Sequence, residues 1–188
     1  MCITWMDLLN IESGSNIVMY GMGSIGSLML QLLKLTAPKN LIVVEREENK
    51  QELAIELGAT KACTDQEIEE IADKLNVDYV IECIGLKNTM EQAIHIAGKR
   101  AKLLFGLGDP EENVSFNQFE AYTKELSIYT SYLNPHTSRK AISLLESGVI
   151  DTKKIISARL SLEEMGEELK TKKYSRKGKV MVSLSGKH

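Results

Sequence analysis

The stretch that decides the fold is NIVMYGMGSIGSLMLQLLKL, residues 16–35. Its first five residues form an apolar run that is typical of a buried strand, and residues 24–35 have the length and apolar spacing of a helix. Between them the chain places Gly21, Gly23 and Gly26 at G-x-G-x-x-G spacing. The sequence therefore predicts a strand, a tight turn and a helix in direct succession, which is the context that gives this spacing a specific meaning.

The alternation of strand and helix continues beyond this stretch. Apolar runs predict further strands at 41–45 (LIVVE), 79–83 (YVIEC), 102–106 (KLLFG) and 126–130 (LSIYT). Helical patterns lie between the strands, at 24–35, 49–57, 65–75 and 89–97. Nearly continuous apolar strands that alternate with helices favour an α/β fold with a doubly wound parallel sheet, because the crossover helices cover both faces.

Several helix ends have signals of their own. Polar pairs at capping-box spacing indicate helix starts at Thr64-x-x-Glu67, Asn88-x-x-Glu91 and Ser161-x-x-Glu164. Glycines stand where a left-handed C-terminal cap is expected, at Gly58 and Gly98. A last apolar run, KVMVSL (179–184), predicts a final strand.

The composition is that of a globular protein with one well-buried core. The chain has 188 residues, of which 43% are hydrophobic and 26% charged, enough for one domain or for one domain with part of a second. A net charge of −3, with both signs interspersed, gives no reason to expect nucleic acid or an anionic membrane as a partner. The apolar runs are too short to span a bilayer, and residues 1–10 lack the pattern of a signal peptide.

The cysteines and histidines do not indicate a metal site. Cys2, Cys63 and Cys83 have neither C-x-x-C nor C-x-x-H spacing, and no pair of histidines has the local spacing of a zinc site. Unpaired cysteines fit a reducing compartment, so we expect a cytoplasmic protein. Cys83, on an apolar strand, is interpreted as a small buried hydrophobe and not as a nucleophile.

The glycine motif has a specific role in this setting. Gly21 permits the tight turn, Gly23 lets the backbone approach a pyrophosphate without a Cβ in the way, and Gly26 lets the helix lie close to the strand. The helix that begins with Ser24 and Ile25 adds free N–H groups and the positive end of a dipole. The alternative, in which the glycines only turn the chain, is disfavoured by the whole pattern.

An acidic residue ends the second predicted strand. Glu45 lies 19 residues after Gly26 and is placed to accept hydrogen bonds from the 2′- and 3′-hydroxyls of a ribose. A 2′-phosphate at the same place would meet a carboxylate, so NAD(H) is favoured over NADP(H) as the cofactor. Arg46 is a discordant neighbour, because an arginine there is able to bind that phosphate.

Four segments together resemble the second half of a medium-chain, zinc-type alcohol or polyol dehydrogenase, in the same order and spacing. They are GSNIVMYGMGSIGSLMLQLLKL (14–35), VVEREENKQELAIELGA (43–59), YVIECIG (79–85) and KELSIYTSYLNPHTSRKAISLLESGVID (124–151). The last segment is especially similar to the branch that contains sorbitol, threonine and sugar-alcohol-phosphate dehydrogenases. The resemblance implies a Rossmann fold with the strand order 3-2-1-4-5-6 that binds NAD(H).

The resemblance also implies roles for further residues. In this family the acidic residue after the second strand faces the adenosine ribose, and a basic residue five positions later faces it too; here these are Glu45 and Lys50. Lys179 corresponds to a cation that relatives place near the pyrophosphate. Residues at the ends of later strands are expected against the nicotinamide half of the cofactor: Cys83, Ile84, Gly85, Gly106 and Leu107.

The family normally has a further domain before this part, which holds its zinc ligands. The resemblance therefore divides the present chain into a joining helix (1–14), a dinucleotide-binding domain (15–131) and a return segment (132–188) that completes the catalytic domain. Without that domain, the return segment is expected either to expose an apolar face and be poorly ordered or to pack in some other way. Because the three cysteines do not map onto the family's zinc ligands, we expect no catalytic residue and no metal ligand in this chain.

The expected activity is therefore divided between two halves of an enzyme. This chain is expected to bind NAD(H), and the whole zinc-dependent enzyme to oxidise a small alcohol or polyol. A homodimer or tetramer is expected, paired through the edge strand at LSIYT (126–130). Two alternatives remain: a non-catalytic NAD(H)-sensing domain, which does not ordinarily contain ELSIYTSYLNP and LLESGVID, and a relative of NADPH-dependent quinone reductases, which Glu45 disfavours.

Overall fold

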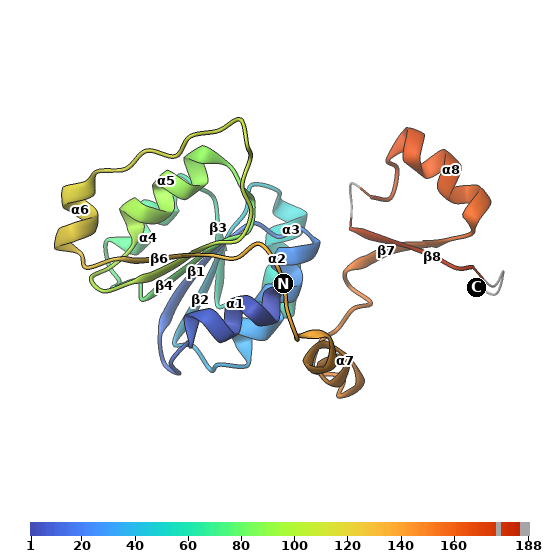
Figure 1. Cartoon of the computed structure of the whole chain (residues 1–188), viewed down its shortest axis with the longest axis horizontal. Coiled ribbons are helices and arrows are strands. Elements are labelled where there is room, and N and C mark those ends of the chain that lie inside the picture. Colours follow the sequence, from blue (N-terminus) through green and yellow to red (C-terminus); the bar gives the residue numbers. More distant parts are fainter. Residues whose placement is uncertain (176–177, 185–188) are drawn as a thin grey trace.

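A parallel β-sheet, the main sheet, forms the centre of the larger part of the molecule (Figure 1). The computed structural model describes residues 1–175 and 178–184. Within these residues the main sheet has six strands in the order β3-β2-β1-β4-β5-β6, so the predicted doubly wound order is confirmed. Its strands are β1 (Asn16–Tyr20), β2 (Asn40–Val44), β3 (Lys61–Cys63), β4 (Tyr79–Glu82), β5 (Lys102–Phe105) and β6 (Ser127–Thr130).

Helices cover both faces of the main sheet (Figure 1). On one face lie α1 (Cys2–Leu9), α2 (Ser24–Lys34) and α3 (Glu48–Leu57). On the other lie α4 (Ile68–Ala72) and α5 (Lys87–Ile96), and α6 (Gln118–Thr123) precedes the edge strand.

The hydrophobic core lies on both sides of the main sheet because side chains alternate along each strand. On β1, Ile17 and Met19 pack towards α2, whereas Val18 and Tyr20 pack towards α4 and α5. All four side chains are buried, as expected for a strand covered on both faces. The fully buried Trp5 on α1 adds a large apolar group to the first side.

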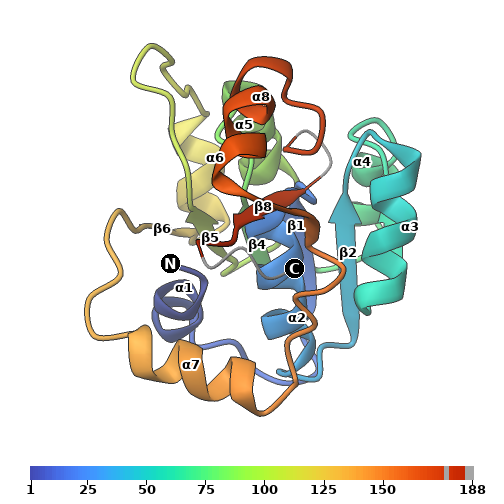
Figure 2. The same cartoon turned by 90° about the vertical axis from the view of Figure 1, so that its right-hand side faces the viewer.

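The chain after β6 forms a smaller unit that stands to one side of the main sheet (Figures 1 and 2). It contains α7 (Ser138–Glu146), β7 (Ile156–Leu160), α8 (Leu162–Thr171) and β8 (Lys179–Val182). Strands β7 and β8 pair in parallel and α8 connects them. The predicted final strand is confirmed over Lys179–Val182, and residues 176–177 and 185–188 of the predicted return segment lie outside the described residues.

Some local predictions are confirmed and others are wrong. Gly58 ends α3 with φ +114°, the left-handed cap that was predicted. Gly98 has no such role, because Ala97 ends α5 in an extended conformation. A Cβ on Gly98 would lie 2.5 Å from Oδ1 of Asn76, so this glycine allows a close approach of two loops.

The helix starts also differ from the prediction in part. Both halves of the capping box at Ser161 are present. Glu67 accepts hydrogen bonds from the N–H and hydroxyl of Thr64, but α4 begins only at Ile68 and is shorter than the predicted helix over 65–75. Asn88 does not cap α5, which begins one residue earlier without a side-chain cap, and Glu91 accepts from the N–H of Ser115 instead. Within the described residues no helix is long and apolar enough to cross a membrane.

Candidate functional site

A pocket of about 300 Å³ lies at the carboxyl ends of β1, β2 and β4, close to the start of α2. In open α/β sheets, ligands bind in the crevice beyond this edge, where the strand order reverses. Here the order reverses between β1 and β4. The pocket is lined by Tyr20, Gly21, Met22, Gly23, Val44, Glu45, Arg46, Lys50, Asp65, Cys83, Ile84, Leu86 and Thr89.

The glycine turn provides one wall of the pocket. Gly21 has φ +92°, a conformation that a residue with a Cβ rarely adopts, and its N–H donates to the carbonyl of Val44 at 2.9 Å. A Cβ on Gly26 would overlap the carbonyl oxygen of Gly21, so only glycine lets α2 pack this close to the turn. A Cβ on Gly23 would meet no protein atom within 4 Å, which leaves its surroundings open to a ligand.

The start of α2 borders this pocket through its N-cap residue. Gly23 is the N-cap of α2, and no side chain caps the helix. The first backbone N–H groups of a helix lack partners within the helix, and the helix dipole places partial positive charge there. Ser24, Ile25 and Gly26 therefore present N–H groups to an anion at this end.

Glu45 is held rigidly beside the turn. Its Oε2 accepts from the N–H of Met22 at 2.9 Å, and its Oε1 accepts from the N–H groups of Arg46 at 2.9 Å and Glu47 at 3.2 Å. A carboxylate has about four acceptor positions. Three hydrogen bonds fix the orientation of Glu45, and acceptor capacity remains for a hydroxyl group.

The two cations near Glu45 both have carboxylate partners. Arg46 donates through Nε and Nη2 to Oδ2 of Asp65, at 3.2 and 2.7 Å. Lys50 forms an ion pair with Glu47 one helical turn away. Arg46 and Lys50, both predicted from the sequence to lie at the cofactor site, line the pocket.

The loop after β4 closes the pocket on another side and is held by Glu82. This buried carboxylate accepts hydrogen bonds from the N–H of Ile84 at 3.0 Å, the N–H of Gly85 at 2.9 Å and the hydroxyl of Thr89 at 2.8 Å. Burial raises the pKa of Glu82 above its usual value, and these hydrogen bonds offset part of that shift. Desolvation also raises the pKa of Cys83, which disfavours a nucleophilic thiolate as predicted. The prediction that Cys83 is buried is wrong, because its side chain is partly exposed where it lines the pocket.

Six of the selected residues do not line the pocket, namely Ser24, Ile25, Gly26, Gly85, Gly106 and Leu107. A Cβ on Gly106 would overlap the ring of Trp5, so that glycine makes room for the buried indole of α1. A Cβ on Gly85 would lie 3.0 Å from the Cβ of Leu107, which shows that the loops after β4 and β5 are in contact.

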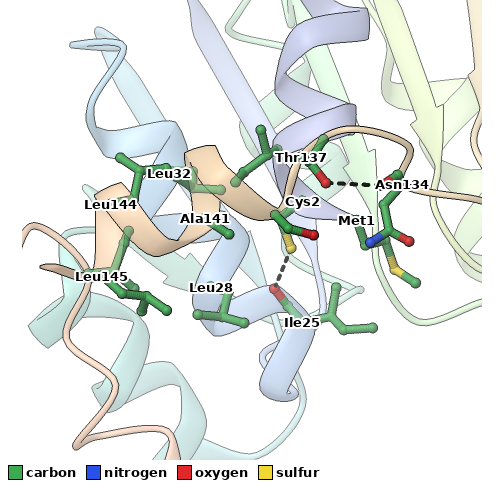
Figure 3. A pocket seen from close by; sticks show the side chains of 13 residues that line it. Met1, Cys2, Ile25, Leu28, Leu32, Asn134, Thr137, Ala141, Leu144 and Leu145 are labelled. Carbon is green, nitrogen blue, oxygen red and sulfur yellow. Dashed lines mark hydrogen bonds between the residues drawn. The ribbon is translucent and has the colours of Figure 1, made fainter.

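Ile25 has its backbone in the first turn of α2 and its side chain in a different pocket. Its side chain lines a second, apolar pocket of about 350 Å³ between α1, α2 and α7 (Figure 3). Figure 3 also shows Leu28 and Leu32 of α2 facing Ala141, Leu144 and Leu145 of α7 in this pocket.

The structure adds pocket residues that the sequence did not reveal. They are Tyr20, Met22, Val44, Asp65, Leu86 and Thr89. Asp65 follows β3, a strand of three residues whose first side chain, that of Lys61, is exposed. No apolar run marked that strand, but an acidic residue at the carboxyl end of a parallel strand was a signal that could have been used. Among residues 1–175 and 178–184, no three His, Cys, Asp or Glu side chains form a group that could hold a metal ion.

A parallel sheet in the order 3-2-1-4-5-6, with a glycine turn after its first strand and an acidic residue after its second, defines the Rossmann class of dinucleotide folds. The sequence pattern of the family described as "Zinc-binding dehydrogenase" matches residues 24–147, which is more than half of the chain. The chain belongs to this family and corresponds to its Rossmann half, as the resemblance indicated.

Curated relatives are consistent with this assignment. The chain is 29% identical to a zinc-type alcohol dehydrogenase-like protein, YdjL, from Escherichia coli K12, over 82% of this chain and 46% of that protein. It is 28% identical to a sorbitol dehydrogenase from Bacillus subtilis 168, over 82% of this chain and 45% of the enzyme. The chain thus spans about half the length of the relatives that it matches.

A solved structure has the same fold. A protein described as a zinc-binding dehydrogenase from Sinorhizobium meliloti 1021, bound to NADP, is similar with a TM-score of 0.88 and 29% identity. The match covers 97% of this chain and 56% of that protein.

Proposed function

We propose that this chain is the NAD(H)-binding half of a zinc-dependent alcohol or polyol dehydrogenase. One observation supports the proposal best: the glycine turn, the uncapped start of α2 and the oriented carboxylate of Glu45 all border one pocket. A pyrophosphate fits the first two features and a ribose diol fits the third. The open space around Gly23 leaves room for the phosphate oxygens.

In the proposed enzyme, the adenosine half of NAD(H) binds between Glu45, Arg46 and Lys50, with the pyrophosphate at Gly21–Gly26. The nicotinamide half extends towards Cys83 and Ile84, which line the other side of the pocket. Gly85, Gly106 and Leu107 support that side through the contact between their loops.

The proposed whole enzyme transfers hydride from a secondary alcohol or sugar alcohol to the cofactor. Its zinc chemistry is expected in the half of the family's sequence that this chain does not cover, so the chain alone should bind cofactor without turnover. An assay of NAD reduction with a panel of polyols tests this division of roles. Alcohol-dependent formation of NADH by this chain alone would contradict it.

Calorimetric titration of the chain with NADH and NADPH tests the binding proposal. We expect NADH to bind to the chain. Glu45→Ala should lower the affinity for NADH by about tenfold or more, because hydrogen bonds to a charged acceptor are lost. Since a relative is described as bound to NADP, both cofactors belong in the same experiment. Failure of both to bind would remove the basis of the proposal.

A homodimer or tetramer through β6 remains the proposed assembly. Strand β6 is the edge of the main sheet, and Ile128 on it is exposed. An exposed edge strand can extend a sheet across a two-fold axis. Sedimentation of the chain, compared with Ile128→Lys, should show a dimer in the first case and a monomer in the second.

A further inference from the structure

We infer that Asp65 sets the preference for NAD(H) over NADP(H) by holding the guanidinium of Arg46. This inference rests on the proposed function, because it concerns the same pocket. Asp65 follows β3 and Arg46 follows β2, and both line the pocket beside Glu45.

Arg46 offers one edge of its guanidinium to Asp65. Its Nη2 lies 2.7 Å and its Nε 3.2 Å from the same carboxylate oxygen, Oδ2. Arginine binds phosphate most effectively when two of its N–H groups donate side by side. Here two such groups already donate to a carboxylate, so a 2′-phosphate beside Glu45 would have to compete with Asp65 for them.

The main chain at Asp65 is fixed from the side of α5. Gln92 donates through Nε2 to the carbonyl of Asp65 at 2.8 Å and to Oε1 of Glu69 at 3.0 Å. The hydroxyl of Tyr20 in turn donates to Oε1 of Gln92 at 3.2 Å, and Tyr20 is fully buried at the end of β1. This network connects Asp65 to the centre of the main sheet and gives its backbone a defined position.

The neighbouring cation does not take the place of Arg46. Lys50, which also lines the pocket, pairs with Glu47. A polar pocket of about 370 Å³ adjoins Arg46 and has acidic residues on its wall, namely Asp65, Glu69 and Glu91. A 2′-phosphate would thus meet cations that already have partners, whereas a ribose hydroxyl needs only the acceptor position that remains on Glu45.

The test compares NADH and NADPH binding to the full chain and to Asp65→Asn by calorimetry at low ionic strength, where exposed charges are least screened. The side chain of Arg46 is 68% exposed and that of Asp65 32% exposed. Exposed pairs of this kind contribute at most about a fivefold factor to an equilibrium. Because Asp65→Asn also removes a negative charge near the phosphate, we expect the ratio of NADPH to NADH affinity to rise about five- to tenfold.

Two control variants separate the released arginine from other effects of the substitution. In Asp65→Asn combined with Arg46→Ala, most of the gain in NADPH affinity should disappear. Asp7→Asn removes another exposed ion pair of 2.7 Å, with Lys140, that lies outside the pocket, and should leave the ratio unchanged.

Every result of this experiment either supports or overturns the proposed role of Asp65. A rise in the ratio that depends on Arg46 supports it. An unchanged ratio in Asp65→Asn, or a rise of the same size without Arg46, would overturn the role of Asp65 while the proposed NAD(H) site stands. Failure of the unmodified chain to bind either cofactor would overturn the proposed function, and this inference with it.

Discussion

The main sheet with its helices and the segment after it are built in different ways. On β1, β2 and β4 almost every side chain is buried. In the described part of the return segment, residues 132–175 and 178–184, α7 has no buried residue and Ile142, Leu145 and Leu169 are exposed. The first region therefore encloses its own core, whereas the second exposes apolar side chains like those of an interface.

Several contacts between the two regions are polar, beside the apolar pocket between α1, α2 and α7. The side chain of Gln31 on α2 exchanges two hydrogen bonds with the backbone of Asp151, at 2.6 and 3.3 Å. Lys154 and Glu56 form an ion pair at 3.0 Å. The candidate pocket is lined by residues 20–89, all in the first region. Stability and cofactor binding should therefore depend on the first region much more than on the return segment.

The largest difference in stability between the two regions is expected from two glycine substitutions. Gly26→Ala places a Cβ onto the carbonyl oxygen of Gly21, which belongs to the backbone and cannot rotate away, so the free energy of unfolding should fall by about 3 kcal/mol or more. Gly166 lies within α8, where a Cβ meets no atom within 4 Å. Gly166→Ala should change stability by at most about 1 kcal/mol, towards greater stability, because alanine favours helix. Urea unfolding of both variants measures the contrast, and equal effects would contradict the comparison.

Two leucine substitutions test the same contrast through packing. Leu33 on α2 is fully buried, and Leu33→Ala should cost about 2–5 kcal/mol through the cavity it leaves. Leu145 on α7 is 49% exposed, and Leu145→Ala should change stability by no more than about 0.5 kcal/mol. A loss of several kcal/mol from Leu145→Ala would mean that α7 belongs to the same cooperative core.

A smaller effect on the free energy of unfolding is expected from the titration of Glu82. Burial raises its pKa above the usual value of 4.5. The stability that this group contributes is therefore fully present below pH 4.5 and is lost as the pH rises through its pKa in the folded protein. The free energy of unfolding, measured relative to Glu82→Gln, should decrease as the pH rises above 4.5. A difference that does not change with pH would refute the assigned environment of Glu82.

Loss of the capping box of α8 is expected to have the smallest effect on the candidate site. Ser161→Ala removes the hydroxyl that accepts from the N–H of Glu164 and should destabilise α8 by about 1 kcal/mol. Amide hydrogen exchange should show faster opening of α8 alone, with NADH affinity unchanged. Weaker NADH binding in this variant would tie the return segment to the pocket.

The sequence was sufficient for features that depend on local patterns. Apolar runs predicted five of the strands to within one residue at each end, and Gly58 and Ser161 acted as predicted. Strand β3 was missed because it has three residues and no apolar run. Gly98 was misread because its role lies in a contact with Asn76, far away in the sequence.

The candidate site, like the fold, was predictable from the sequence only where a local pattern marks its residues. Glycine spacing and Glu45 follow a known pattern, so these residues could be selected from the sequence. Asp65 and Gln92 matter through contacts between separate loops and helices, which no local pattern records. Gly106 was selected for the pocket, but it packs against Trp5 instead.

Amide NMR spectra of the labelled chain, recorded during titration with NADH, test the central claim most directly. The account predicts that the largest shifts fall on residues 21–26 and on Glu45, Arg46 and Ile84, while the amides of α8 keep their positions. The absence of shifts at millimolar NADH, or shifts confined to the return segment, would contradict the claim that the first region holds the cofactor.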